Sequence, residues 1–403
     1  MSLLTDRTSK FVRPKEARRL GYYPFFRVVE SEQDTEVIIN GKKVLMFGSN
    51  SYLGITNHPK VKEASKKAID KYGSACAGSR FLNGTLDLHI ELEKKLARFV
   101  GKEDALVFST GFQVNLGVIP AIAGRNDYVI IDELVHASII EGARLSFAKT
   151  LKFKHNDIEH LEKVLQRCVP EAIKLIVVDG VFSMEGDIAK LPDIVEVAKK
   201  YNATIMVDEA HSLGVFGENG RGLVNYFGLQ NDIELIMGTF SKSFASLGGF
   251  IASDSDTIDY LRHNARSLIF SASITPASTA SVIAALELME QEPGMLKKLW
   301  ENTEFALKKS RELGFDIGKT ETPIIPIYIR DDEKTFRLTQ MLLDNGIFVN
   351  PVVAPAVPPE DTLIRFSIMA THTKDQISFA LDKIHEIGTK LGIVFNNHVK
   401  NKS

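Results

Sequence analysis

The chain has 403 residues, of which 44% are hydrophobic and 25% are charged, and its formal net charge is -2 at pH 7. This size and composition are typical of a globular enzyme with one large and one smaller domain, and the charge balance argues against a nucleic-acid-binding surface. The two cysteines, Cys76 and Cys168, lack the companions of a disulfide framework or a zinc site, so we expect free thiols and no metal.

Residues 1–20 are polar and charged, which predicts an arm or a short helix. They lack the apolar core of a signal peptide, and no apolar run reaches the roughly 18 residues that a membrane span needs, so we expect a cytoplasmic protein. Residues 21–27 then bring four aromatic rings together. We predict that these rings pack against the body of the protein or a partner subunit; the alternative is a channel lining for a long acyl chain.

Residues 37–47 predict a β-hairpin with Asn40-Gly41 at its turn, within an N-terminal segment of residues 1–55. Two helices follow, over residues 59–72 and from near Thr85. His89 lies on a side face of the second helix, where we expect it to be hydrogen-bonded or solvated. The core face of that helix is predicted from apolar side chains at helical spacing: Leu88, Leu92, Leu96 and Phe99.

Apolar strands and helices then alternate between about residues 105 and 252, which predicts an α/β fold with a mostly parallel sheet and helices on both faces. The predicted strands cover residues 105–108, 128–133, 174–179, 203–207 and 233–237, and one helix covers 193–200. We assign these elements to a large domain of residues 56–291. Ligands bind beyond the carboxyl ends of such strands, so the residues after each strand are candidates for a site.

Asp208 ends one of these strands, and His211 follows three residues later. Asp208 could keep a pyridine nitrogen protonated and His211 could hydrogen-bond a ring hydroxyl, although an aspartate there can also be a helix cap. The next strand leads into residues 238–249, where Lys242 stands among hydroxyls that include Thr239 and Ser241. An amine beside anion-binding hydroxyls suits pyridoxal 5'-phosphate (PLP), whose aldehyde condenses with lysine. A solvated lysine on a polar turn is the alternative.

Other strand ends and helix starts fit the same interpretation. Residues 109–115 form a glycine-bearing turn between a strand and a helix, an arrangement that binds phosphate. His136 follows the strand at 128–133; an imidazole there can stack on a pyridine ring, although a lone histidine in this position is more often a capping residue. Residues 270–276 open another helix with hydroxyls and are suited to an anion or to plain capping.

Past residue 292 the pattern predicts a small α+β domain of residues 292–403. Helices are expected near 295–313, 334–345 and 373–391, the last with a capping box at its start, and strands at 324–328 and 363–368. Four prolines in residues 350–359 predict a stiff, extended loop that would suit a lid over an apolar substrate. Arg365 has apolar neighbours in its strand, where a charged residue usually has a partner such as a carboxylate; a solvated edge position is the alternative.

The motifs at residues 50–54, 180–187, 207–212 and 238–242 together resemble the α-oxoamine synthases, fold-type I PLP enzymes that join an amino acid to an acyl-CoA with loss of carbon dioxide. The resemblance covers about residues 21–391. It implies a homodimer in which the partner chain contributes to each site, and a catalytic role for Lys242 as cofactor-bearing group and base. The implied catalytic residues are Lys242, His136, Asp208 and His211; the implied cofactor-binding residues are Gly111, Phe112, His136, Ser183, Asp208, His211, Thr239, Ser241 and Lys242, with Ser271 and Ala272 from the partner chain; and the implied substrate-binding residues are Asn50, His136 and Arg365.

Within that family the aromatic segment at 22–25 and the motifs at 239–244 and 365–373 most resemble the branch that condenses L-serine with palmitoyl-CoA to give 3-ketodihydrosphingosine. Glycine C-acetyltransferase and 8-amino-7-oxononanoate synthase stay open, because every site residue named above serves them as well. A non-catalytic partner subunit would be expected to lose the lysine, and a nicotinamide-dependent dehydrogenase would be expected to carry a G-x-G-x-x-G turn that is missing here. The sequence says nothing of peripheral membrane contact.

Overall fold

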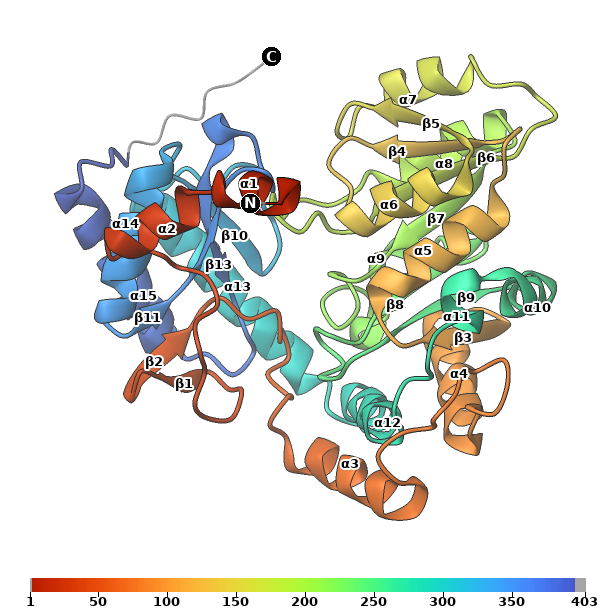
Figure 1. Ribbon diagram of the computed structural model, residues 1–403, viewed down its shortest axis with the longest axis horizontal. Coiled ribbons are helices and arrows are strands. Elements are labelled where there is room, and N and C mark those ends of the chain that lie inside the picture. The colour runs from red at the N-terminus through yellow and green to blue at the C-terminus, as the bar shows by residue number, and fades with distance from the viewer. Residues whose placement is uncertain (1, 396–403) are drawn as a thin grey trace. The chain divides into compact units, whose positions relative to one another are not determined.

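The computed structural model describes residues 2–395, which pack as two compact units (Figure 1). The larger unit comprises Asn50–Trp300 and Glu321–Pro323; the smaller comprises residues up to Ser49, Glu301–Thr320 and residues from Ile324 onward. The N-terminal segment that we expected as a separate piece therefore packs in the same unit as the C-terminal residues. The predicted domain boundaries near residues 55 and 292 stay a prediction.

A seven-stranded sheet forms the centre of the larger unit, in the order β3-β9-β8-β7-β6-β4-β5. Neighbouring strands are parallel, except that β9 runs antiparallel to both β3 and β8. The mostly parallel sheet predicted from the sequence is thereby confirmed. Its strands are β3 (Asp104–Phe108), β4 (Tyr128–Asp132), β5 (Lys149–Phe153), β6 (Lys174–Asp179), β7 (Thr204–Asp208), β8 (Leu235–Thr239) and β9 (Gly249–Ser253).

Helices connect these strands and pack against the sheet (Figure 1). Helix α13 (Gly294–Glu312) spans the boundary between the units: its residues up to Trp300 belong to the larger unit and those from Glu301 to the smaller one. The other helices are α3 (Pro59–Tyr72), α4 (Asp87–Val100), α5 (Gly111–Ile122), α6 (Ala137–Ser146), α7 (Ile158–Leu165), α8 (Leu191–Lys200), α9 (Leu223–Tyr226), α10 (Ser255–Asn264), α11 (Arg266–Ile269) and α12 (Pro276–Gln291), with a 3-10 turn at Glu218–Gly220.

Helix α4 illustrates how far helical spacing predicts burial. Three of the four predicted core side chains are buried, whereas Leu88, in the first turn, is half-buried. His89 is fully buried, and it is hydrogen-bonded as one of our two alternatives required: Nδ1 accepts from the backbone N–H of Leu86, and Nε2 lies 3.0 Å from the carbonyl oxygen of Ile274. Burial lowers the pKa of His89 to about 4, so the ring is neutral and belongs to the core.

The smaller unit contains two three-stranded sheets, in the orders β1-β2-β11 and β10-β13-β12. Residues 350–352 form strand β12, so only the later part of the proline-rich segment is a loop. The elements are α1 (Leu3–Ser9), α2 (Arg13–Arg19), β1 (Glu36–Ile39), β2 (Lys42–Met46), β10 (Ile324–Tyr328), α14 (Asp332–Asp344), β11 (Ile347–Phe348), β12 (Asn350–Val352), β13 (Leu363–Ser367) and α15 (Lys374–Lys390), with a 3-10 turn at Pro359–Asp361.

Two local predictions for this unit are confirmed. Strands β1 and β2 form the hairpin, and Asn40 and Gly41 at its turn have φ of 51° and 69°, the left-handed values that this tight turn needs. Thr373 and Gln376 form the capping box of α15. The predicted packing of the aromatic cluster holds only in part. Tyr22 stacks on Phe336 of α14 with ring centroids 6.4 Å apart, and Phe25 meets the same ring edge-on, whereas Phe26 is 92% exposed. Within residues 2–395, no helix combines the length and apolar character that crossing a membrane requires.

Candidate active site

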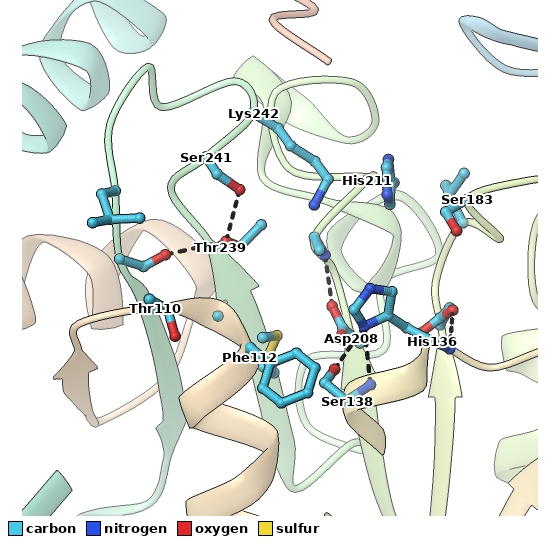
Figure 2. A pocket seen from close by; sticks show the side chains of 17 residues that line it. Thr110, Phe112, His136, Ser138, Ser183, Asp208, His211, Thr239, Ser241 and Lys242 are labelled. Carbon is cyan, nitrogen blue, oxygen red and sulfur yellow. Dashed lines mark hydrogen bonds between the residues drawn. The ribbon is translucent and has the colours of Figure 1, made fainter. Parts of the chain in front are cut away.

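A pocket of about 260 Å³ lies at the carboxyl ends of the central strands of the larger unit (Figure 2). Residues from five different connections meet there, because the ends of parallel strands share one edge of the sheet. The lining residues are Thr110, Gly111, Phe112, His136, Ser138, Asp179, Val181, Ser183, Asp208, Ala210, His211, Met237, Thr239, Ser241, Lys242, Leu247 and Gly248. All predicted cofactor-binding residues of the chain itself are among them.

Asp208, at the end of β7, is buried and held by two hydrogen bonds. Its Oδ2 accepts from the side-chain amide of Asn115, at 3.0 Å, and its Oδ1 accepts from the backbone N–H of Ala210, at 3.0 Å. Burial, together with the nearby charge of Asp208, raises the pKa of Asp179 well above its usual range. The pair of strand-end carboxyl groups thus favours one negative charge at the floor of the pocket, a suitable partner for a protonated ring nitrogen.

His136 is both a helix cap and a pocket residue, and its stacking on a cofactor ring stays a prediction. Its backbone N–H donates to Asp179 Oδ2, at 3.0 Å, and its Nδ1 lies 2.7 Å from the hydroxyl of Ser138 at the start of α6. Burial of the ring lowers the pKa of His136. The nearby charge of Lys242 lowers it too, whereas the charge of Asp208 opposes both effects. A neutral imidazole held in this way can lie against a planar ring.

His211 is held in place by a hydrogen bond with a buried tyrosine. The hydroxyl of Tyr52, a fully buried side chain, lies 2.6 Å from His211 Nδ1. In Figure 2 the Lys242 side chain extends into the pocket with His211 next to its tip, and Ser183 lies beyond His211. These residues come from the connections after β7, β6 and β8, and the structure brings them together as the sequence motifs suggested.

The loop that bears Lys242 is tightly fastened. It connects β8 to its antiparallel neighbour β9, and backbone hydrogen bonds join Phe240 to Gly248 and Ser246 to Phe240. Phe240 and Phe244, on either side of the lysine, are completely buried. The amine is therefore presented from a rigid base, which suits a group that must meet one atom of a cofactor.

The other end of the pocket offers donors for an anion. Helix α5 begins at Gly111, where the first backbone N–H groups of a helix have no partners within the helix and carry its positive dipole end. The hydroxyls of Thr239 and Ser241 lie 3.2 Å apart beside this helix start. A side chain on Gly111 would place its Cβ 2.7 Å from Thr239 Oγ1, so only glycine lets the helix start approach these hydroxyls. The residues present therefore fit a PLP group, with its phosphate at this end.

The remaining predicted residues lie elsewhere in the chain. Ser271 and Ala272 do not line the pocket: Ser271 Oγ accepts from the side-chain amide of Gln113, at 2.9 Å, and the carbonyl oxygen of Ala272 accepts from the hydroxyl of Ser109. Asn50 is half-buried at the start of the larger unit. Arg365 belongs to the smaller unit, where it is buried in β13 and donates to Ser367 Oγ, at 2.7 Å.

Sequence reasoning gave no role to Asn115, Ser138 or Asp179, although all three support the predicted residues. The side chain of Asn115 joins Asp208 to the hydroxyl of Ser138, at 2.8 Å, and so links two strand-end connections. Asp179 could have been found, because it ends a buried strand as Asp208 does. Asn115 could not, because its position one turn into α5 carries no signal of what it faces.

Comparison with known proteins agrees with this geometry. The family model for aminotransferase class I and II matches residues 42–384. A serine palmitoyltransferase from Bacteroides ovatus is 61% identical over 384 residues, covering 95% of this chain and 98% of that relative, and an 8-amino-7-oxononanoate synthase from Thermosipho melanesiensis is 43% identical over 94% of this chain and 97% of that relative. A solved structure of serine palmitoyltransferase from S. paucimobilis with bound PLP and myriocin is 38% identical, covers 98% of this chain and 100% of that one, and has a TM-score of 0.94.

Proposed function

Because this chain belongs to the aminotransferase class I and II family, we propose that it is a PLP-dependent acyltransferase that condenses L-serine with palmitoyl-CoA. The products would be 3-ketodihydrosphingosine, coenzyme A and carbon dioxide, as the first step of sphingolipid synthesis. The observation that carries the choice of substrates is the 61% identity to a serine palmitoyltransferase over nearly the full length of both chains. The pocket geometry supports the cofactor independently of that similarity.

Each lining group would take one part of the cofactor. When bound, PLP supplies an electron sink for the electron pair that remains on Cα of the amino acid after that carbon loses its proton. The Lys242 amine would hold the aldehyde carbon and Asp208 the ring nitrogen, while the imidazole of His136 would cover one ring face. The ring hydroxyl would face His211 and Ser183, and the phosphate would face Gly111, Phe112, Thr239 and Ser241, with Ser271 and Ala272 of a partner chain.

The side chains would then transfer protons and orient the substrate. The amine of serine would first displace the Lys242 amine from the aldehyde carbon. The freed Lys242 amine would then take the proton from Cα of serine, with His136 orienting the amino acid beside it. Cα would then attack the thioester carbonyl, and coenzyme A would leave as the thiolate and take up a proton. The serine carboxylate would leave as carbon dioxide, and the electron pair left on Cα would take a proton back, which the Lys242 ammonium is placed to give. Asn50 and Arg365 are the predicted carboxylate ligands, a role that rests on the sequence motifs and on the planar, two-pronged guanidinium.

The test is product formation with matched substrates. Purified protein loaded with PLP is incubated with L-serine, glycine or L-alanine against acetyl-, pimeloyl- and palmitoyl-CoA, and release of coenzyme A is followed with the amino ketone identified by mass spectrometry. We expect L-serine with palmitoyl-CoA to be preferred. The second candidate is an 8-amino-7-oxononanoate synthase, which the 43% identity to such an enzyme favours. A preference for pimeloyl-CoA would select that activity and reject ours.

The partner-chain role of Ser271 and Ala272 makes a homodimer part of the proposal, and we place the protein in the cytoplasm. Mixing two inactive variants tests the dimer. One variant carries Lys242→Ala and the other carries a bulky substitution at Ser271. If each site combines residues of both chains, exchange of subunits regenerates some intact sites and restores part of the activity. Two fully dimeric variants that remain inactive after exchange would contradict a shared site.

A further inference from the structure

His155, which does not line the pocket, connects two segments that do: the one that carries His136 and the one that carries Ser183. His155 follows β5, and both of its ring nitrogens face carboxylates: Nδ1 lies 3.1 Å from Asp132 Oδ1, and Nε2 lies 2.9 Å from Asp187 Oδ2. Although burial lowers it, hydrogen bonds to these two carboxylates raise the pKa of His155 to about 10. The ring is therefore an imidazolium that donates from both nitrogens at neutral pH.

Asp132 connects His155 to the first wall. It ends β4, and its carboxylate also accepts from the backbone N–H groups of Leu134 and Asn156, both at 2.9 Å. The connection from Asp132 leads within four residues to His136, whose backbone N–H is fixed on Asp179. Any shift of the Asp132 carboxylate would thus act at the base of the short segment that carries His136.

Asp187 connects His155 to the second wall. Residues 180–188 form a narrow loop after β6, closed by a bridge between Val181 and Ile188 and by a hydrogen bond from Phe182 N–H to the Asp187 carbonyl oxygen, at 3.0 Å. The ring of His155 lies edge-on to Phe182, with centroids 4.4 Å apart. Ser183, which lines the pocket, sits in this loop directly after Phe182.

We propose that His155 is a positioning residue, which fastens the loop bearing Ser183 to the segment bearing His136 and thereby sets the fit of the cofactor ring between them. The inference rests on the proposed cofactor contacts of His136 and Ser183. It requires nothing of the substrate, so it applies whichever acyl-CoA the protein uses.

The electrostatic reason lies in the surrounding charges. The Asp132 side chain is almost fully buried and the Asp187 side chain is 18% exposed, so neither carboxylate is well solvated. Glu185, in the same loop, adds a third carboxyl group, and burial raises its pKa. Without the imidazolium these acidic groups lose the cation between them. The remaining link is the uncharged Asn156, whose backbone N–H donates to Asp132 and whose side-chain amide donates to Asp187 and to the carbonyl oxygen of Ile188. Glutamine at position 155 carries no charge. Its donors sit on a single amide nitrogen, so it cannot replace the imidazolium between the two carboxylates.

The test measures cofactor binding directly. His155→Gln is compared with His160→Gln, a matched change in the same segment, where the His160 ring accepts from the backbone N–H of Lys154. Apo-protein is titrated with PLP for its Kd, the visible circular dichroism of the bound cofactor is recorded, and thermal unfolding of the apo form is followed. We expect His155→Gln to raise the PLP Kd by about tenfold or more and to change the dichroism band, as loss of supporting contacts around a ligand commonly does. His160→Gln should retain both wild-type values.

A wild-type PLP Kd and dichroism band in His155→Gln would overturn the proposal, whether or not its unfolding temperature falls. If His155→Gln does not fold, Asp187→Ala keeps the contact of His155 with Asp132 and removes the side-chain contacts of the Ser183 loop with His155 and Asn156. It should also raise the PLP Kd, and an unchanged Kd would again overturn the proposal. A wild-type protein that binds PLP but fails to condense serine would contradict the proposed function alone.

Discussion

Replacing Gly111 by alanine tests how the phosphate end of the pocket is built. The added Cβ would lie 2.7 Å from Thr239 Oγ1 and 2.8 Å from Thr239 Cβ, whereas ordinary contacts begin at 3.4 Å. The start of α5 must therefore move away from β8, which carries Thr239. Forcing an extra methyl group into a packed site costs about 1–3 kcal/mol. If that strain falls mainly on the bound form, the PLP Kd rises by about 5- to 150-fold.

A matched control is available in the same unit. Gly294, at the start of α13, has no neighbouring atom within 4 Å of an added Cβ, so Gly294→Ala should leave PLP binding unchanged. Gly249→Ala should be more damaging than Gly111→Ala, because its Cβ would lie 2.7 Å from the backbone Cα of Gly111, which cannot rotate aside. All three variants are compared by PLP titration of the apo-protein and by thermal unfolding. Wild-type PLP affinity in Gly111→Ala would refute the close approach of helix and hydroxyls as the basis of phosphate binding.

Four further outcomes are expected. Lys242→Ala should abolish turnover and the visible band of the bound cofactor, and a variant that kept that band with wild-type turnover would remove Lys242 from the site. Tyr52→Phe deletes the hydroxyl held by His211, at a cost of about 0.5–1.5 kcal/mol, so kcat/KM should fall about 2- to 13-fold without loss of folding; an unchanged kcat/KM would count against this contact. Arg365→Lys keeps the charge but loses the two-pronged guanidinium, so KM for serine should rise more than kcat falls, and the reverse pattern would argue against carboxylate binding. The folded-state pKa of His155, about 10, lies above its ordinary value of 6.5, so the stabilisation that His155 gives is complete below pH 6.5 and is lost as pH rises toward 10. The unfolding free energy of wild type minus that of His155→Gln should therefore shrink over this range. A difference that does not change with pH would contradict the raised pKa.

The fold was predictable where burial leaves a pattern in the sequence. Strands β4, β6 and β8 are buried along their whole length and appear as apolar runs. Strand β5 was missed because it lies at the edge of the sheet and is mostly exposed, so its five residues include two lysines and a threonine and form no apolar run. Leu88 shows a related limit, since the first turn of a helix can extend beyond the core that its spacing suggests.

The candidate site was predictable where chemistry requires a particular residue type after a strand. Lys242 and Asp208 were found in this way, and the structure brings both to one pocket. The supporting contacts of Asn115 and His155 were not found, because each depends on which distant segments meet in space. His155 in particular stands on a connection whose strand had no recognisable pattern, so its two carboxylate partners could not be inferred from spacing.

The small sheet β1-β2-β11 has a consequence for biosynthesis. Its third strand is more than 300 positions downstream of the hairpin formed by the first two, and a two-stranded hairpin is marginally stable in water by itself. During synthesis on the ribosome, the hairpin therefore lacks its third strand while the whole seven-stranded sheet emerges and can fold before it. The residues of the hairpin are thus translated long before the strand that completes their sheet.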